Sequence, residues 1–370
     1  MENVIPFYSK SSFYEIACMM FENCNLKCKF CFEPHKNKKI DLEYIKNLPN
    51  IAYKNFTKVY EQKPWIDNLY IMIWGGEIFY DGLDDSVFDV YYVFVDKINE
   101  LFNKSFPKVH ITFSWLSNGV FTKRERVEKL IQYSKGIINF SYDPVYRFNS
   151  QKQLQTMIDN ADYFKNNMGD KVSLTLTKES IKSFIEGKSE LLRFHQMGYN
   201  IDVNYYIPNP NWQEFLPSDD EIYTFLKWAL DNRLFGIKII EKIMAYFTKE
   251  NVTHYCNCIT CSQISYGEWS TDCVKKSSSL TSELFYQENN DKITEENSHY
   301  IKSTMGILKR GCLNCKYYNK CQMPCWISFI FKGVKSEKCF YKQAYEYIEK
   351  NPQIIYDYKK WRNIDDRTKK

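Results

Sequence analysis

Three cysteines near the amino terminus are spaced for metal chemistry. They lie in the stretch Cys24-Asn-Leu-Lys-Cys28-Lys-Phe-Cys31, with three residues between the first pair and two between the second. A loop with this spacing can place three thiolates on three irons of a four-iron cube and leave the fourth iron without a protein ligand. An open iron can bind a substrate or cofactor. A zinc site is the alternative, but it needs a fourth ligand, and His35 is the only histidine close by.

A second group of cysteines lies toward the carboxyl terminus. None of the 13 cysteines falls between positions 32 and 255. Because no signal peptide is visible, we expect a reducing compartment, where clustered cysteines are metal ligands more often than disulfides. All-cysteine sites fit either iron–sulfur clusters or zinc. The members of this group are Cys256, Cys258, Cys261, Cys273, Cys312, Cys315, Cys321, Cys325 and Cys339.

The elements that must position these groups alternate between strands and helices. Strands separated by helices predict a parallel sheet with right-handed crossovers, and six such units fit a partial (β/α)6 barrel. In such barrels the active site lies at the carboxyl ends of the strands. An open doubly wound sheet is the structural alternative. The expected strands are 14–21, 68–74, 110–116, 137–142, 172–176 and 200–206, and the expected helices are 41–62, 85–104, 122–134, 150–166, 179–197 and 218–232.

The chain divides into regions by composition. We expect a barrel over 1–235, a helical bridge over 236–255, a cysteine-rich domain over 256–350 and a charged tail over 351–370, in which 356–370 is a frayed end. Cys18 lies mid-strand among apolar neighbours and is expected in the core.

Bulk properties exclude several partners. The net charge of +5 over 370 residues gives no argument for nucleic acid. No apolar run reaches the length of a membrane span. We therefore expect a cytoplasmic protein.

The Cys24–Cys31 loop resembles the signature of the radical S-adenosylmethionine (SAM) superfamily. The resemblance implies that the open iron chelates the amino and carboxylate groups of SAM. One electron then cleaves SAM to methionine and a 5′-deoxyadenosyl radical, which abstracts hydrogen from a C–H bond. Phe30 matches the aromatic position that packs on the adenine in that family.

Two strand-end motifs extend the resemblance. Trp74-Gly75-Gly76-Glu77 looks like the family's GGE motif, which recognises the methionyl amino group, although Ile78 stands where the family usually has Pro. Ser117-Asn118-Gly119 resembles the family's TNG, which contacts the cofactor. A plain Asn-Gly turn is the alternative for the second motif.

The fourth and fifth strands also end in polar residues. Ser141-Tyr142-Asp143-Pro144 resembles the S-x-D-G of the peptide-modifying branch, with Pro144 in place of Gly, and Arg147 lies where those enzymes often carry an Arg. Asp143 is either catalytic or a structural cap for the loop. Thr175 or Thr177 is expected to reach the ribose or carboxylate of SAM.

The carboxyl-terminal cysteines resemble the SPASM extension of radical SAM enzymes, which holds two auxiliary four-iron clusters. The resemblance implies three [4Fe-4S] clusters in all. An additional cysteine leaves open whether Cys256 or Cys258 is the ligand, and the spacing from Gly267 to Cys273 is one residue longer than usual. By position, one auxiliary cluster would use Cys256 or Cys258 with Cys261, Cys273 and Cys325, and the other would use Cys312, Cys315, Cys321 and Cys339.

SPASM proteins mostly act on peptides or proteins. Our leading hypothesis is an oxidase that installs a crosslink or another C–H modification in a ribosomally made peptide. The alternative within enzymes is a sulfatase-maturating enzyme. In that branch an Asp directly follows the Cys273 position and acts as the base, whereas Val274 follows here and Asp272 precedes. Asp143 and Asp272 are therefore the candidate catalytic residues.

A third alternative is a non-catalytic iron–sulfur or zinc protein that carries electrons or serves as a scaffold. An enzyme of the proposed kind needs an external electron donor such as flavodoxin or ferredoxin. Only about twelve residues precede the first strand, so we expect no leader-binding domain at this end. The substrate would then bind at the barrel mouth and the SPASM region, or through a separate leader-peptide-binding protein.

Overall fold

The computed structural model describes residues 12–31, 38–165, 168–169, 171–205, 213–248, 261–265, 268–270, 312–317, 321 and 339–368. Its strands are β1 (Phe13–Met19), β2 (Asn68–Trp74), β3 (His110–Ser117), β4 (Ile137–Tyr142), β5 (Lys171–Leu176), β6 (Asn200–Tyr205), β7 (Cys261–Ser265) and β8 (Glu268–Ser270). Its α-helices are α1 (Leu42–Gln62), α2 (Asp85–Ser105), α3 (Arg124–Ser134), α4 (Gln151–Phe164), α5 (Lys178–Ile185), α6 (Leu191–Gln196), α7 (Asp219–Asp231), α8 (Lys238–Thr248), α12 (Phe340–Lys350) and α13 (Gln353–Thr368). Two short 3-10 helices cover Gln213–Phe215 and Cys312–Asn314.

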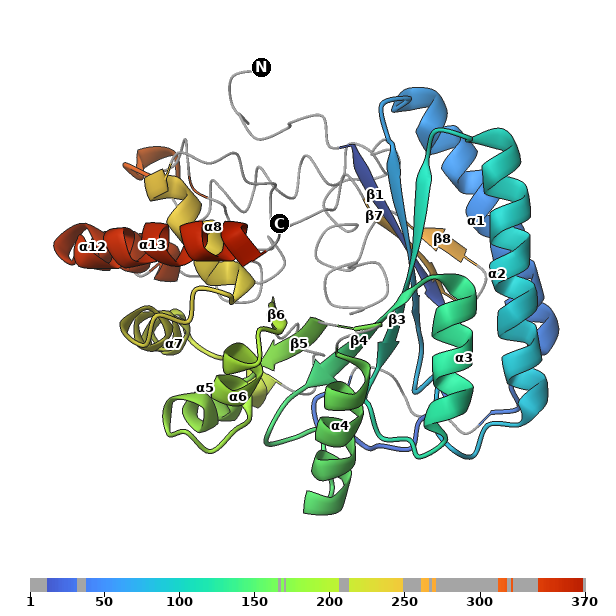
Figure 1. The fold of residues 1–370 in the computed structure, drawn as a ribbon, viewed down its shortest axis with the longest axis horizontal. Coiled ribbons are helices and arrows are strands. Elements are labelled where there is room, and N and C mark those ends of the chain that lie inside the picture. The colour runs from blue at the N-terminus through green and yellow to red at the C-terminus, as the bar shows by residue number, and fades with distance from the viewer. Residues whose placement is uncertain are drawn as a thin grey trace, which may run out of the picture.

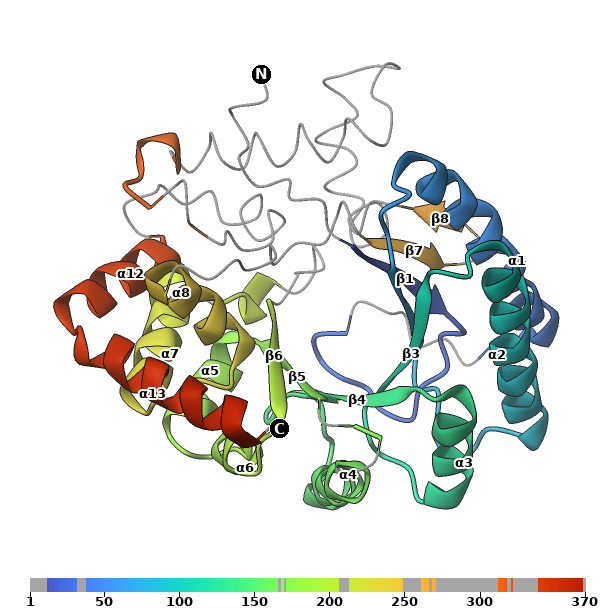
Figure 2. The ribbon, with the colours of Figure 1, turned by 45° about the horizontal axis from the view of Figure 1, so that its top comes forward.

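The strands form one sheet in the order β6-β5-β4-β3-β2-β1-β7-β8. Each neighbouring pair from β1 to β6 is parallel. The sheet curls into an open arc with helices on its outer side (Figures 1 and 2). The predicted partial barrel is therefore confirmed, and the flat doubly wound alternative is not. The sequence did not predict the β7–β8 hairpin, which extends the barrel sheet because β7 pairs in parallel with the free edge of β1.

Residue alternation along each strand separates the helix-covered face from the concave face. On β2, Leu69, Ile71 and Ile73 are fully buried, whereas the intervening Met72 and Trp74 are half-exposed. The fully buried set packs under the outer helices, so the half-exposed set lines the inside of the arc. Polar side chains that continue from the strand ends can therefore meet on one side of the sheet.

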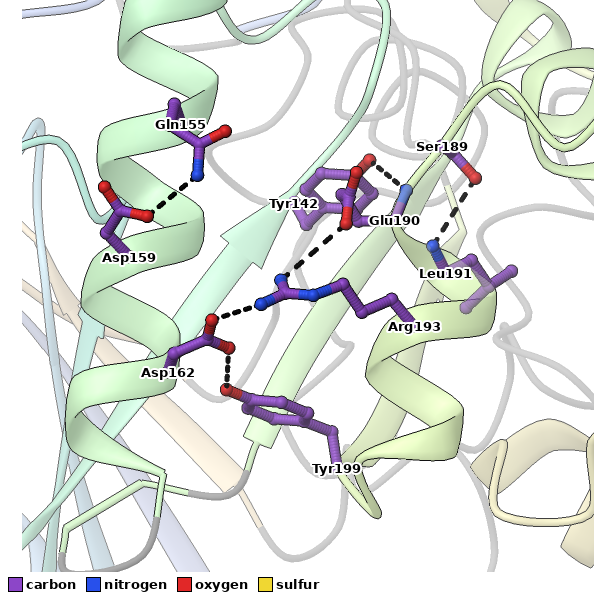
Figure 3. A network of polar contacts seen from close by, with 9 residues as sticks. All are labelled: Tyr142, Gln155, Asp159, Asp162, Ser189, Glu190, Leu191, Arg193 and Tyr199. Atoms are coloured by element: carbon purple, nitrogen blue, oxygen red, sulfur yellow. Dashed lines mark hydrogen bonds and ion pairs between the residues drawn. The ribbon is translucent and has the colours of Figure 1, made fainter.

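A polar network fixes the carboxyl end of β4 against the outer helices (Figure 3). The Tyr142 hydroxyl accepts a hydrogen bond from the Glu190 backbone N–H at 3.0 Å. The Arg193 guanidinium of α6 pairs with both Asp162 of α4 and the Glu190 carboxylate. Tyr142 points outward into this network, so the next residue along, Asp143, is turned toward the barrel interior.

Two predicted helix boundaries are wrong. The segment expected as one helix over 179–197 is two helices, α5 and α6, because the chain turns at Gly187 with φ +68°. The third helix was expected to begin at Thr122, but α3 begins only at Arg124. The Thr122 hydroxyl and backbone N–H instead bind the Asp81 carboxylate at 3.0 and 2.9 Å. Asp41 does cap α1, by accepting from the Tyr44 N–H at 3.0 Å.

The carboxyl-terminal tail expected to fray is the helix α13, which packs on the barrel. The Tyr358 ring is fully buried, 5.3 Å from the Phe235 ring and 5.7 Å from the Trp361 ring. An ion pair at 2.7 Å between Arg233 and Asp357 adds to the contact. None of the helices in the described residues has the length and apolarity that a bilayer span requires.

We predict that Tyr358→Ala lowers the free energy of unfolding by about 3–5 kcal/mol, because it leaves a cavity where a large ring is buried. Tyr356 is the matched control, since it lies two residues away on the same helix and is 64% exposed. Tyr356→Ala should change the free energy by no more than about 0.5 kcal/mol. Urea denaturation measures both, and equal losses in the two variants would mean that α13 does not pack as described.

Candidate metal and cofactor site at the strand ends

The cysteine loop leaves the carboxyl end of β1 and holds its three thiols close together. Cys24, Cys28 and Cys31 are all partly buried. Burial raises the pKa of the Cys24 thiol to about 12, and the neighbouring Glu77, Cys28 and Cys31 add to this effect. Short local contacts order the loop: the Leu26 N–H reaches the Cys24 sulfur at 3.4 Å, and the Cys31 N–H donates to the Cys28 carbonyl at 3.1 Å. Thiols bind metals as thiolates, so metal binding at this loop would release their protons.

Gly75 and Gly76 let the cysteine loop pack directly on the end of β2. The Gly76 N–H donates to the Phe21 carbonyl at 2.8 Å, and the Glu77 N–H donates to the Asn23 carbonyl at 2.8 Å. A Cβ at position 76 would lie 2.0 Å from the Asn23 oxygen, and one at position 75 would lie 2.6 Å from the Phe21 oxygen. The backbone that approaches these glycines is thus the loop that carries the cysteines.

The Glu77 carboxylate binds protein donors. It is 1% exposed. One of its oxygens accepts from the Ser117 hydroxyl at 2.7 Å and the Phe79 N–H at 3.0 Å, and the other accepts from the Asn118 N–H at 2.5 Å. Burial raises the Glu77 pKa to about 7, against the opposing effect of these hydrogen bonds. Glu77 therefore ties the end of β2 to the end of β3. Its expected contact with the methionyl amino group stays a prediction.

Asn118 joins the end of β3 to the cysteine loop. Its side-chain amide donates to Asn25 Oδ1 at 2.9 Å and reaches the Cys24 sulfur at 3.8 Å. Its own oxygen accepts from the Val120 N–H, and Asn25 in turn donates to the Val120 carbonyl at 2.6 Å. The Ser117-Asn118-Gly119 stretch is therefore more than a plain turn, because its side chains hold the first cysteine in place. A cofactor contact by Ser117 or Asn118 stays a prediction.

Asp143 organises the loop after β4. It is fully buried, and one carboxylate oxygen accepts from the Val145 and Tyr146 N–H groups at 2.9 and 2.6 Å. The other accepts from the Thr177 hydroxyl at 3.4 Å, at the start of α5. Burial raises the Asp143 pKa, and these hydrogen bonds oppose the rise. This geometry supports the structural interpretation of Asp143. Ser141 and Thr175 are half-buried, at alternate positions to the fully buried residues of β4 and β5.

Arg147 places a cation beside the cysteine loop. Its guanidinium carbon lies 5.4 Å from the centre of the Phe30 ring, and its backbone carbonyl accepts from the Cys28 thiol at 3.6 Å. Burial raises the Cys28 pKa, and the positive charge of Arg147 opposes that rise. The Arg147 Nε is buried without a hydrogen-bond partner. A buried guanidinium nitrogen in this state is suited to an anionic ligand.

The Phe30 ring lies beside the Arg147 guanidinium. It packs in a small apolar cluster with Phe215, Cys28 and Tyr146, and the Tyr146 and Phe215 rings lie 4.7 Å apart. The Lys29 N–H also donates to the Tyr146 carbonyl at 3.2 Å. The loop after β4 and the segment before α7 therefore clamp the last turn of the cysteine loop.

Four carboxyl-terminal cysteines lie near one another. The Cys312–Asn314 turn places the Cys315 N–H 2.9 Å from the Cys312 carbonyl. Burial raises the Cys321 pKa well above its ordinary value, and Cys339, Cys312 and Cys315 lie near enough to raise it further. Four thiols are the number of ligands that a closed four-iron cluster uses, and their assignment to one cluster stays a prediction.

The other predicted auxiliary ligands cannot be placed as a set. Cys256, Cys258, Cys273 and Cys325, together with Asp272, lie outside the described residues. Cys261 is described only as the first residue of β7, opposite Glu15 of β1. Cys18 is fully buried in the core, as expected.

In the described part of the chain, no three His, Cys, Asp or Glu side chains are grouped to hold a single metal ion.

Solved structures share this fold over most of the chain. Native anSMEcpe with bound AdoMet matches at a TM-score of 0.61 and 14% identity, covering 93% of this chain and 99% of that one. Native anSMEcpe with bound AdoMet and the Cp18Cys peptide matches at a TM-score of 0.61 and 16% identity, with 93% and 98% covered. Streptococcus suis SuiB bound to its precursor peptide SuiA matches at a TM-score of 0.48 and 17% identity, covering 89% of this chain and 76% of that one.

No family model and no curated protein matches the sequence. At these identities the likeness shows the fold alone. The described residues therefore share the fold of a protein whose structure contains bound AdoMet.

We predict that Glu77→Gln lowers the free energy of unfolding by about 1–3 kcal/mol at pH 8, because an amide N–H would face the Asn118 N–H or another donor. The pH dependence should also change. The folded state keeps a proton on Glu77 that the unfolded state releases, so this group's contribution is fully present below pH 4.5 and is lost as the pH rises through about 7. The stability of the wild-type protein should fall more steeply between pH 5 and pH 8 than that of the variant.

Glu100→Gln is the control for this experiment, since Glu100 is exposed and pairs with Lys97 on the same helix. It should leave both the stability and its pH dependence nearly unchanged. Urea denaturation at pH 5 and pH 8 measures all three proteins. Parallel pH profiles for the wild type and Glu77→Gln would show that Glu77 does not titrate as described.

Proposed function

We propose that this chain is a radical SAM/SPASM enzyme that abstracts hydrogen from a residue of a peptide or protein substrate. One observation carries the proposal. A loop with three cysteines leaves the first strand of a partial barrel with six parallel strands. The backbone of Gly76 and Glu77, after the second strand, holds the start of this loop. The Asn118 side chain, after the third strand, binds Asn25 in the loop, and Glu77 binds Ser117. The AdoMet-bound neighbours with the same fold support it.

Three [4Fe-4S] clusters and SAM are the cofactors that we infer. Cys24, Cys28 and Cys31 would hold the first cluster, and Cys312, Cys315, Cys321 and Cys339 would hold one auxiliary cluster. The other would use Cys256 or Cys258 with Cys261, Cys273 and Cys325. With SAM bound, the first cluster supplies a strongly reducing electron and, through it, a radical able to break a C–H bond.

The chain's own residues would bind and orient SAM at the barrel mouth. Arg147 offers a buried guanidinium without a partner at Nε, which suits the methionyl carboxylate. Phe30, 5.4 Å away, offers an apolar ring for the adenine. Ser141 and Thr175 can supply hydroxyls to the ribose from β4 and β5. Glu77, Ser117 and Asn118 would hold the cysteine loop in the geometry that this binding needs.

A peptide is the substrate class that we infer. One of the structures that share this fold contains a bound peptide, Cp18Cys. We propose an oxidative crosslink or another C–H modification in a ribosomally made peptide. Sulfatase maturation is the second candidate, since anSMEcpe is a sulfatase maturase. The position after Cys273 argues against it, because Val274 stands where that branch has its Asp base.

Asp143 and Asp272 are the two candidates for the general base of the reaction. The two Asp143 oxygens accept hydrogen bonds from the loop and from Thr177, which weakens its candidacy. Asp272 is the other candidate. We further propose a cytoplasmic location, an external donor such as flavodoxin or ferredoxin, and a substrate that is recognised directly or through a separate leader-peptide-binding protein.

The test is an iron and sulfide count on protein reconstituted without oxygen, followed by measurement of 5′-deoxyadenosine under reductant. We predict about 12 irons per chain. The Cys24/Cys28/Cys31 triple alanine variant should lose about four irons and all SAM cleavage. Cys18→Ala is the control, because Cys18 lies in the core beside the same loop, and this variant should keep both.

Two results would contradict the proposal. A fully clustered protein that never forms 5′-deoxyadenosine is an electron carrier or scaffold. A protein with zinc in place of the auxiliary irons has no electron acceptor for an oxidative crosslink, and a simpler radical reaction would replace it.

A further inference from the structure

One fully buried polar side chain on α4 reaches the loop that follows β3. Asn160 is 0% exposed, and its side-chain nitrogen donates to the Gly119 carbonyl at 2.8 Å and to the Phe121 carbonyl at 2.7 Å. Its side-chain oxygen accepts from the Arg124 Nε at 2.6 Å. Because carbonyls only accept and a guanidinium only donates, these partners fix which end of the Asn160 amide faces the loop.

The helix that carries Asn160 is held on two sides. A Cβ at position 119 would lie 2.8 Å from the Met157 Cγ, so a glycine there lets α4 pack directly on the loop. Gly119 also has a φ of +76°, a conformation that other residues rarely adopt. On another side, the ion pair between Asp162 and Arg193 ties α4 to α6 (Figure 3). Asn160 therefore belongs to a helix that is anchored against both the loop and α6.

The carbonyl between the two that Asn160 binds is bonded to the cysteine loop. The Val120 carbonyl accepts from the Asn25 side-chain nitrogen at 2.6 Å, and the Asn25 side-chain oxygen accepts from the Asn118 amide at 2.9 Å. Asn118 also lies 3.8 Å from the Cys24 sulfur. Three successive carbonyls thus connect α4 to the residue next to the first cysteine.

The contact at Asn25 depends on the contacts at Asn160 because the two differ in exposure. Asn25 is exposed, so water competes with the Val120 carbonyl for its side chain. A hydrogen bond in contact with water is most favourable when its partner is already held in position, since ordering two mobile groups costs conformational entropy. Asn160 holds the loop from a fully buried position, where water does not compete.

We propose that Asn160 is a positioning residue for the cluster at Cys24, Cys28 and Cys31. Its amide holds the loop between β3 and α3 so that the Val120 carbonyl keeps the start of the cysteine loop in place. The inference rests on the proposed function, since it requires a cluster and SAM at this loop. Groups that orient metal ligands from outside the coordination sphere typically affect metal affinity or activity by about 10–100-fold.

The experiment compares Asn160→Asp with a matched control. Asn160→Asp keeps the size of the side chain and an oxygen for Arg124, but it removes both donors to the loop. The control is Ser134→Ala, which also removes the partner of a buried donor, the Trp115 indole N–H at 3.1 Å. Ser134 is the last residue of α3, at the end of that helix that leads back to the amino end of β4 and away from the site.

Two measurements on the reconstituted holoenzyme report on the cysteine loop. Asn160→Asp should raise the SAM concentration that shifts the electron paramagnetic resonance signal of the first cluster about tenfold. The signals of the auxiliary clusters should stay where they are. Amide hydrogen exchange should become faster in residues 24–31. Ser134→Ala should leave the response to SAM and the exchange in residues 24–31 unchanged.

A double-mutant cycle tests the route of the effect. Asn25→Ala removes the contact with Val120 from the side of the cysteine loop, so it should weaken the response to SAM by a similar factor. In the Asn25→Ala background, Asn160→Asp should add little, because both substitutions break the same connection. Asn25→Ala also covers the case in which Asn160→Asp does not fold, since Asn25 is exposed and its truncation leaves the core intact.

The outcomes separate this inference from the proposed function. A wild-type holoenzyme whose signals do not respond to SAM contradicts the proposed function. A wild-type protein that responds, together with an unchanged response in Asn160→Asp or in Asn25→Ala, overturns the inference alone. Fully additive effects of the two substitutions also overturn it. An equal loss in Ser134→Ala does so as well, because it would reflect lost stability rather than the position of the loop.

Discussion

The close approach of one backbone to another at the end of β2 is the constraint on which the site depends. The chain from Phe21 to Asn23 runs so near Gly75 and Gly76 that no side chain fits between them. Two backbone hydrogen bonds close this contact. Because Cys24 is the next residue along, the position of the first thiol follows directly from that contact.

The residues at the strand ends form a support for the cysteine loop. Glu77 accepts hydrogen bonds from Ser117 and Asn118, and Asn118 then reaches Asn25 and the Cys24 sulfur. The polar residues after β2 and β3 are thus linked to one another before any cofactor is considered. On the other side of the loop, the Arg147 guanidinium lies beside the Phe30 ring. Its buried Nε has no hydrogen-bond partner and is available to an anion. A site that holds both a cluster and a charged ligand needs a rigid support for the cluster ligands and an unpaired polar group for the charged ligand.

Much of the fold and of the site followed from the sequence, for local reasons. The β2 and β4 boundaries were predicted correctly because short apolar runs end at turn residues. The break at Gly187 was missed because apolar residues continue at helical spacing on both sides of it. Thr122 was wrongly placed inside the third helix because its hydrogen-bond partner, Asp81, lies 41 residues away. The structural role of Glu77 depends on a contact with Ser117, 40 residues away, which no local pattern contains.

The central claim is that the Cys24, Cys28 and Cys31 thiolates leave one iron open to SAM. The most direct measurement is the electron paramagnetic resonance spectrum of the reduced, fully clustered protein with and without added SAM. The account predicts that SAM shifts one signal, and that this signal is absent from the Cys24/Cys28/Cys31 triple alanine variant. A spectrum that SAM leaves unchanged, in protein that contains the first cluster, would contradict it.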